Sequence, residues 1–142
     1  QDESFPFASH EDLELAVRLD KAGMMLRFDR NARAFHHHTL AVPSAVKRVY
    51  LMGHSASIYW GKVGESGSPV KKLLRSLIRG LCATPPVTAL WKNLCAGCAN
   101  EEGRGHLYFY ALLSLSYWIG LADSKAGRPP RDISALVSRN TY

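Results

Sequence analysis

The sequence has few of the features that mark several large classes of protein. Its 142 residues include only three cysteines, Cys82, Cys95 and Cys98, which cannot all form disulfides with one another. We therefore expect a reducing, cytoplasmic setting rather than a secreted protein stabilised by disulfides. The longest apolar stretch, residues 106–122, falls short of the roughly 20 residues that a membrane-spanning helix needs. The motifs of phosphate-binding loops, dinucleotide sites, nucleophile elbows and HExxH zinc sites are missing. What remains is a globular chain of ordinary domain size.

Acidic residues are also scarce over most of the chain. Residues 1–42 hold five basic and seven acidic residues, a net charge of −2, whereas residues 43–142 carry +8, for a total of +6. A basic region of this kind indicates a partner with negative charge, such as a phosphate group or a lipid headgroup. We expect no nucleic-acid partner, because no nucleic-acid-binding motif accompanies the charge.

The stretch from Ser9 to His38 concentrates the residues that could perform chemistry. Ser9 and Asp12 have the spacing of a capping box, which predicts a helix over about residues 10–22 that ends at Gly23. On this helix Asp12 is expected to face inward and Glu11 outward. Asp12 is then either a helix cap alone or a general base held at a rigid helix start. The helix is expected to bury one stripe and to expose another, namely Leu15, Ala16, Leu19 and Ala22 against Glu14, Arg18 and Lys21.

Two short strands are predicted after this helix, at residues 24–28 and 32–38, with a turn at 29–31. Side chains alternate along a strand, so His36 and His38 share one face. Two imidazoles on one face suit a divalent transition metal such as manganese. The alternative is a patch of surface histidine without a ligand.

The pattern from Pro43 onward is helical. A flexible connector is expected at residues 61–69 and a loosely held tail after Lys125. Cys95 and Cys98 follow an apolar helical stripe, so buried thiols explain them better than a zinc site. Helices are predicted over four ranges, residues 44–60, 70–81, 87–99 and 106–122, the last as a buried core helix.

The predicted helix at residues 70–81 is amphipathic. Its basic side holds Lys71, Lys72, Arg75 and Arg79, opposite a side of apolar residues. A basic face of this kind is either the solvated outside of a helix that covers a core, or a contact for an anionic membrane surface.

The first 60 residues carry an ordered series of motifs: Glu11-Asp12, Leu15, Arg18-Leu19, Gly23, the spaced Ala32, Ala34 and His36, then Arg48 and Gly53. This series resembles the C-terminal part of the catalytic domain of family 2 inverting glycosyltransferases, which have the GT-A fold. The resemblance implies sugar transfer from a nucleotide-sugar to a sugar or lipid-linked acceptor. It implies that Asp12 is the general base and that Glu11 serves acceptor positioning or structure. His36, with His38 as a second candidate, would lie near the diphosphate and a divalent ion, Mn2+ or Mg2+.

Two parts of that family's pattern, the nucleotide-binding βαβ half and the D-x-D metal motif, are missing from this sequence. The chain begins at Gln1 without a basic-plus-apolar leader. We therefore expect a fragment that is inactive alone and whose partner is the N-terminal half of the same enzyme.

The predicted fold is α+β and mainly α. Residues 1–60 would form the tail of a GT-A domain, with the acidic helix and a short β-hairpin, and residues 61–142 a helical bundle. A cytoplasmic location is expected, with peripheral attachment to the inner face of the membrane as an option. The alternative function is a non-enzymatic basic helical module that binds an anionic membrane or a protein. A third is a metal sensor built on the histidines.

Overall fold

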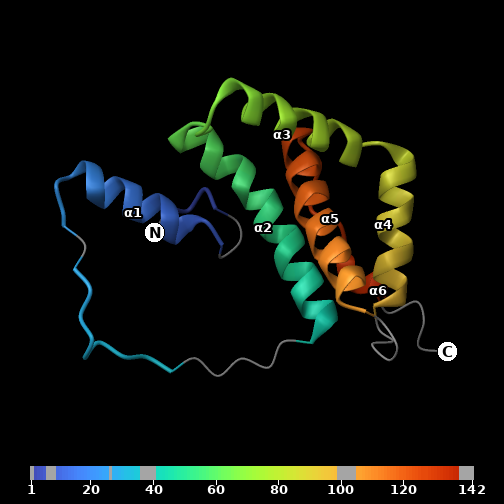
Figure 1. Cartoon of the computed structure of the whole chain (residues 1–142), viewed down its shortest axis with the longest axis horizontal. Coiled ribbons are helices and arrows are strands. Elements are labelled where there is room, and N and C mark those ends of the chain that lie inside the picture. Colours follow the sequence, from blue (N-terminus) through green and yellow to red (C-terminus); the bar gives the residue numbers. More distant parts are fainter. Residues whose placement is uncertain (1, 6–8, 26, 36–40, 99–104, 138–142) are drawn as a thin grey trace.

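The computed structural model describes residues 2–5, 9–25, 27–35, 41–98 and 105–137 (Figure 1). These residues form six helices: α1 (Glu11–Lys21), α2 (Val42–Val63), α3 (Pro69–Cys82), α4 (Pro85–Gly97), α5 (His106–Lys125) and α6 (Ile133–Val137). The mainly helical character of the predicted fold is confirmed. None of the described helices combines the length and the hydropathy needed to cross a membrane.

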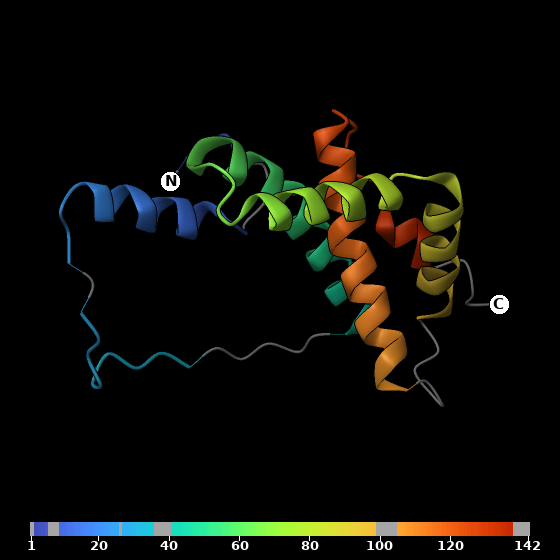
Figure 2. The ribbon, with the colours of Figure 1, turned by 45° about the horizontal axis from the view of Figure 1, so that its top comes forward.

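The predicted β-hairpin is not seen among the described residues, and residues 36–38 of its second strand lie outside them. A turn forms at residues 30–31, where the backbone N–H of Asn31 donates to Oδ1 of Asp29 at 2.8 Å, but the described residues on either side form no strand. A two-stranded hairpin is marginal without a third strand or a helix packed against it. Residues 27–35 instead run outside the helical bundle, as the extended trace in Figures 1 and 2 shows.

Helices α2 and α5 form the centre of the bundle, with α3, α4 and α6 packed around them (Figure 2). Two glycines bring α2 and α5 to backbone contact. A Cβ atom on Gly53 would lie 1.9 Å from the carbonyl oxygen of Tyr117, and one on Gly120 would lie 2.1 Å from that of Tyr50. Because both distances are far below van der Waals contact, this approach requires glycine on both helices.

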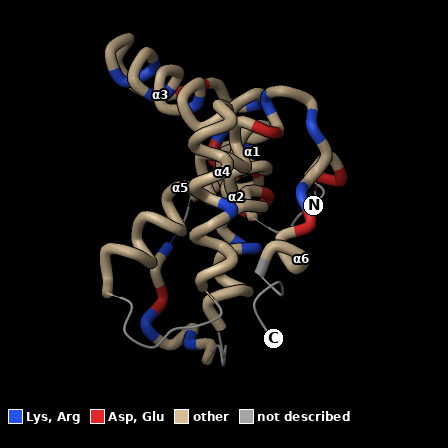
Figure 3. Tube along the Cα trace, turned by 90° about the vertical axis from the view of Figure 1, so that its right-hand side faces the viewer, with Lys and Arg blue, Asp and Glu red and all other residues tan. Residues whose placement is uncertain are grey.

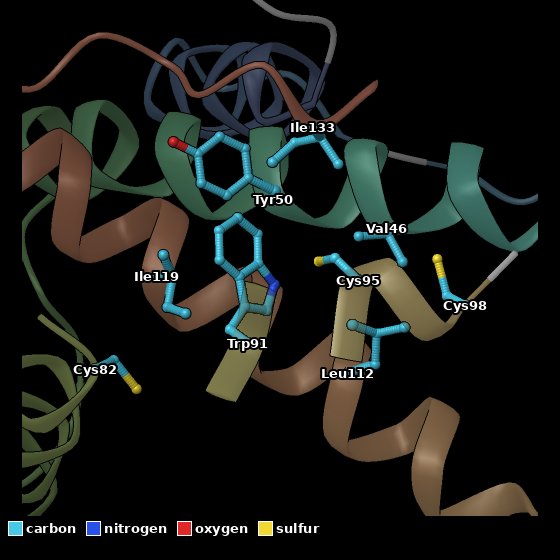
Figure 4. Packing of buried hydrophobic residues seen from close by; sticks show 9 residues of the cluster. All are labelled: Val46, Tyr50, Cys82, Trp91, Cys95, Cys98, Leu112, Ile119 and Ile133. Atoms are coloured by element: carbon cyan, nitrogen blue, oxygen red, sulfur yellow. The ribbon is translucent and has the colours of Figure 1, made fainter. Parts of the chain in front are cut away.

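The core lies where α2, α4 and α5 meet (Figure 4). The rings of Tyr50 and Trp91 stack with their centroids 5.7 Å apart, and Nε1 of Trp91 donates to Oγ of Ser116 at 2.9 Å. The predictions that α5 is a core helix and that Cys95 and Cys98 are buried thiols are confirmed. The buried cluster consists of Val46, Tyr50, Cys82, Trp91, Cys95, Cys98, Leu112, Ile119 and Ile133.

The connector between α2 and α3 is shorter than predicted. Helix α2 continues through Gly61 and ends at Val63, where Gly64 takes a positive φ of 87°. Helix α3 already begins at Pro69, after Ser68, whose Oγ accepts from the backbone N–H of Lys71 at 3.4 Å. The predicted domain boundary at residue 60 therefore falls inside the last turn of α2.

The prediction of a loosely held tail after Lys125 is wrong for the described residues. Arg128 and Arg131 pair with the buried carboxylate of Asp123 on α5, and Ile133 is buried in the core. A carboxylate that is removed from water requires cations, and here the tail supplies them.

Candidate functional site

The start of α1 is fixed by contacts to the preceding residues and to α2. The backbone N–H of Ser9 donates to Oε2 of Glu11, and Oγ of Ser9 lies 2.8 Å from Nδ1 of His10. The buried ring of His10 lies against Tyr59 of α2, with centroids 5.5 Å apart. Burial lowers the pKa of His10, against the opposing charge of Glu11, so a neutral imidazole docks α1 on the bundle.

The predicted orientation of Asp12 is wrong, because Asp12 is exposed while its neighbour Glu11 is half-buried. The capping box of Ser9 and Asp12 does not form either: His10 is the N-cap residue and its side chain makes no cap. The longer side chain of Glu11 reaches back to the amide of Ser9 and takes that role instead. The acidic pair thus lies at the helix start as predicted, but Asp12 is the exposed residue and Glu11 the half-buried one.

The stripes predicted for α1 are right only in part: Arg18 and Lys21 are exposed as expected, and Leu15 is half-buried. Glu14, expected in solvent, is buried and lies 2.8 Å from Nε of Arg18. Ala16, Leu19 and Ala22, expected to be buried, are exposed. The face of α1 turned to the bundle is thus that of His10 and Glu14, and most of the apolar stripe is left open to solvent.

The residues that follow α1 expose large apolar side chains as well. Phe28 and Phe35 are 91% and 93% exposed, and the side chains of Met24 and Met25 line a hollow of about 280 Å3 with Leu19. Several large apolar side chains exposed within one short segment indicate a surface that another molecule or segment covers. We call Leu19, Met24, Met25, Phe28 and Phe35 the open apolar surface.

His36 and His38 lie outside the described residues, so their pairing stays a prediction. Within the described ranges, no three His, Cys, Asp or Glu side chains lie close enough to hold a metal ion. Burial, together with the neighbouring Cys98, raises the pKa of Cys95 to about 12, so this thiol is protonated at neutral pH.

Helix α3 is amphipathic, as predicted, but its apolar side is the one that faces solvent. Its basic side is turned toward the protein: Nη1 of Arg75 donates to the carbonyl of Ser66 at 2.7 Å, and its guanidinium lies 5.7 Å from the ring centroid of Trp60. Nη1 of Arg79 lies 3.9 Å from Glu65. The end of α2 and the connector thus supply a ring and acceptors for the arginines. Of the two alternatives left open for this helix, the one in which its apolar side covers a core is not the arrangement seen. Lys71 and Lys72 are exposed, as are the apolar residues Val70, Leu73, Leu74, Leu77 and Leu81.

Sequence reasoning missed a buried charge cluster around Asp123. This carboxylate is 1% exposed and accepts from Nε and Nη2 of Arg131 at 2.6 and 2.8 Å, from Nη1 of Arg128 at 3.1 Å and from the hydroxyl of Tyr50 at 3.0 Å. Burial by itself raises the pKa of Asp123, but its bonds to Arg131, Tyr50 and Arg128 outweigh that effect and hold the pKa below its ordinary value. The signal was a lone acid in the apolar pattern of α5, followed by two arginines.

Comparison with known proteins yields no match, whether to a family model, to a curated protein or to a solved structure.

Proposed function

We propose that this chain is the C-terminal part of an inverting glycosyltransferase related to family 2, and that Asp12 is its general base. The observation that carries the proposal is the ordered motif series that runs from Glu11-Asp12 through Arg18-Leu19 and Gly23 to His36. No one of these motifs is specific by itself, but their order and spacing together fit this family's acidic helix and the segment after it.

The geometry at the start of α1 supports this role for Asp12. A general base must be reachable by the hydroxyl that it deprotonates, and Asp12 is exposed. The first turn around it is positioned by the bond between Ser9 and Glu11 and by the packing of His10 on Tyr59. A base that acts on a bound acceptor needs a carboxylate that the acceptor can reach and a backbone that holds this carboxylate in a fixed position.

In the proposed reaction, a carboxylate oxygen of Asp12 takes the proton of the acceptor hydroxyl as that oxygen attacks the anomeric carbon of the donor. The bond between this carbon and the diphosphate oxygen breaks on the opposite face, so the configuration inverts and the electron pair leaves with the nucleoside diphosphate. A divalent ion, Mn2+ or Mg2+, would supply charge neutralisation for that leaving group, with His36 and His38 as its proposed neighbours.

The open apolar surface supports the N-terminal half of the same enzyme as a partner. Phe28 and Phe35 lie on an extended segment whose backbone is outside the bundle (Figure 1). An extended segment can add to the edge of a sheet through its backbone N–H and C=O groups. A GT-A sheet would provide such an edge and would cover the apolar side chains at the same time.

The test is to replace the proposed base in the longer enzyme that contains this segment. Asp12→Asn should lower kcat for sugar transfer by about 10²–10⁴-fold, the contribution typical of a general base. Asp20→Asn is the matched control, because it changes another exposed carboxylate of α1 and should leave kcat unchanged. Transfer at the wild-type rate by a folded Asp12→Asn enzyme would remove Asp12 from the mechanism. Separately, His36→Ala with His38→Ala should weaken Mn2+ binding, and an unchanged titration would reject that metal role.

A non-enzymatic module that binds an anionic membrane was the alternative, and the exposed apolar face of α3 favours membrane contact. The two roles use different elements, α1 and α3, and do not compete.

A further inference from the structure

The exposed face of α3 is apolar along its whole length. Val70, Leu73, Leu74, Leu77 and Leu81 are between 56% and 74% exposed, although helical spacing puts all five on one side. One exposed leucine is ordinary on a protein surface, but a continuous stripe of five is a contact surface. We call these five residues the leucine face.

The leucine face is held outward by the opposite side of the helix. Arg75 binds the carbonyl of Ser66 and lies over Trp60, Arg79 pairs with Glu65, and Cys82 is buried in the core. Rotating α3 to bury its leucines would break all of these contacts and would place two guanidinium groups in solvent. The exposure of the leucine face is therefore built into the packing.

The positive charge of α3 indicates the kind of partner that the leucine face contacts. Helix α3 contains four basic residues and no acidic one, and Figure 3 shows lysine and arginine recurring along it. Lys71 and Lys72 are exposed near its start, where their ammonium groups can reach the level of lipid phosphates while the leucines enter the acyl region. The 14 residues of α3 span about 21 Å. That length suits a helix lying in the plane of a membrane surface rather than one crossing it.

We infer that α3 docks the protein on an anionic lipid surface through its leucine face, with Lys71 and Lys72 contacting the headgroups. A second copy of the chain fits this surface less well. Pairing two leucine faces would bring the exposed Lys71 and Lys72 of both copies near the contact, and α3 has no acidic residue to neutralise them.

The first experiment is co-sedimentation of the chain with phosphatidylcholine vesicles, with and without phosphatidylglycerol. Wild-type chain should pellet with the anionic vesicles and should be released by salt. Leu73→Asp with Leu77→Asp should weaken binding by about a hundredfold or more, since each buried leucine contributes at least about tenfold. Lys71→Glu with Lys72→Glu should weaken binding to anionic vesicles only.

The matched control is Leu107→Asp, which places a charge at an exposed leucine of α5, away from the leucine face. This variant should pellet like wild type. All of these substitutions are at exposed positions, so the helical circular-dichroism spectrum should stay unchanged and loss of binding cannot be ascribed to unfolding.

A second measurement reports insertion directly. Leu77→Cys provides an exposed thiol on the leucine face, and the three native cysteines are buried, so an environment-sensitive fluorophore can be attached selectively. Its emission should shift to the blue and become resistant to aqueous quenchers when anionic vesicles are added. The same probe at Leu107→Cys should respond little.

Three results would overturn the inference. The first is wild-type chain that stays in the supernatant with anionic vesicles. The second is equal pelleting of the Leu73→Asp, Leu77→Asp variant and wild type. The third is a dimer in light scattering that this variant abolishes without any binding to lipid, which would assign the leucine face to a second copy of the chain.

Discussion

The hydroxyl of Tyr50 on α2 donates a hydrogen bond to the buried carboxylate of Asp123 on α5 at 3.0 Å. The same hydroxyl accepts from the backbone N–H of Arg131 at 3.0 Å. Burial and the charge of Asp123 raise the pKa of Tyr50 to about 12, and they outweigh the opposite effect of the bond from the amide of Arg131. The phenol therefore keeps its proton at neutral pH. One side chain thereby ties α2, α5 and the segment before α6 together.

Removing the principal cation of this cluster should destabilise the fold. Arg131→Met leaves the carboxylate of Asp123 buried with only Arg128 as a cationic partner, and we expect the free energy of unfolding to fall by about 3–5 kcal/mol. Urea denaturation measures the change, and Lys92→Met, at an exposed position, is the control. A loss no larger than that of the control would mean that the cluster does not hold the tail.

The same cluster predicts loss of stability in acid. The pKa of Asp123 is lower in the folded chain than in the unfolded one. The ionised carboxylate therefore contributes fully to the free energy of unfolding above the pKa of the unfolded chain, about 3.9, and this contribution is lost as the pH falls through the pKa of the folded chain. The free energy of unfolding should therefore decrease on acidification below about pH 5. Asp123→Asn should be less stable and should depend less on pH over this window. Asp20→Asn should retain the wild-type slope, and equal slopes for all three proteins would contradict the assignment.

The contact between α2 and α5 predicts opposite effects for chemically identical substitutions. Gly120→Ala would place its Cβ 2.1 Å from the carbonyl oxygen of Tyr50, a clash with backbone that no rotamer relieves, and should cost about 3 kcal/mol or more. Gly61→Ala lies in α2 with open space around its Cβ and should stabilise the helix by about 0.5–1 kcal/mol. Thermal unfolding of both variants checks the pair. A Gly120→Ala chain as stable as Gly61→Ala would show that the two helices do not approach as described.

Local periodicity in the sequence predicts the helices well but not the sides that they bury. The spacing of apolar residues over 70–81 is sufficient to predict α3, because amphipathic spacing is a property of the segment itself. Which side faces the protein depends on Trp60, Glu65 and Ser66, which bind the arginines from an adjacent segment. Spacing within one segment holds no information about these contacts.

The acidic helix shows the same limit at the candidate site. Helix α1 and the acidic pair at its start follow from the sequence, but the inward orientation of Asp12 follows only if Leu15 and Ala16, three and four residues later, face the core. In the structure Ala16 is exposed and Leu15 only half-buried, and His10 makes the contact to α2 instead. The hairpin fails for a related reason, because strands require partners that a local pattern does not supply.

The buried cysteines predict a chain whose thiols react only after unfolding. Burial raises the pKa of both Cys82 and Cys95, and Cys98 is buried as well, so at mildly alkaline pH the folded chain should present little accessible thiolate. Ellman's reagent should modify the folded chain at least about a hundredfold more slowly than the chain in concentrated urea, because reaction requires opening of the core around Trp91. The Leu77→Cys variant is the internal standard, since it should give one rapid thiol equivalent against the slow native background. Rapid reaction of the wild-type chain under native conditions would show that the end of α3 or α4 opens without unfolding of the core, and would also remove the basis for selective labelling of the leucine face.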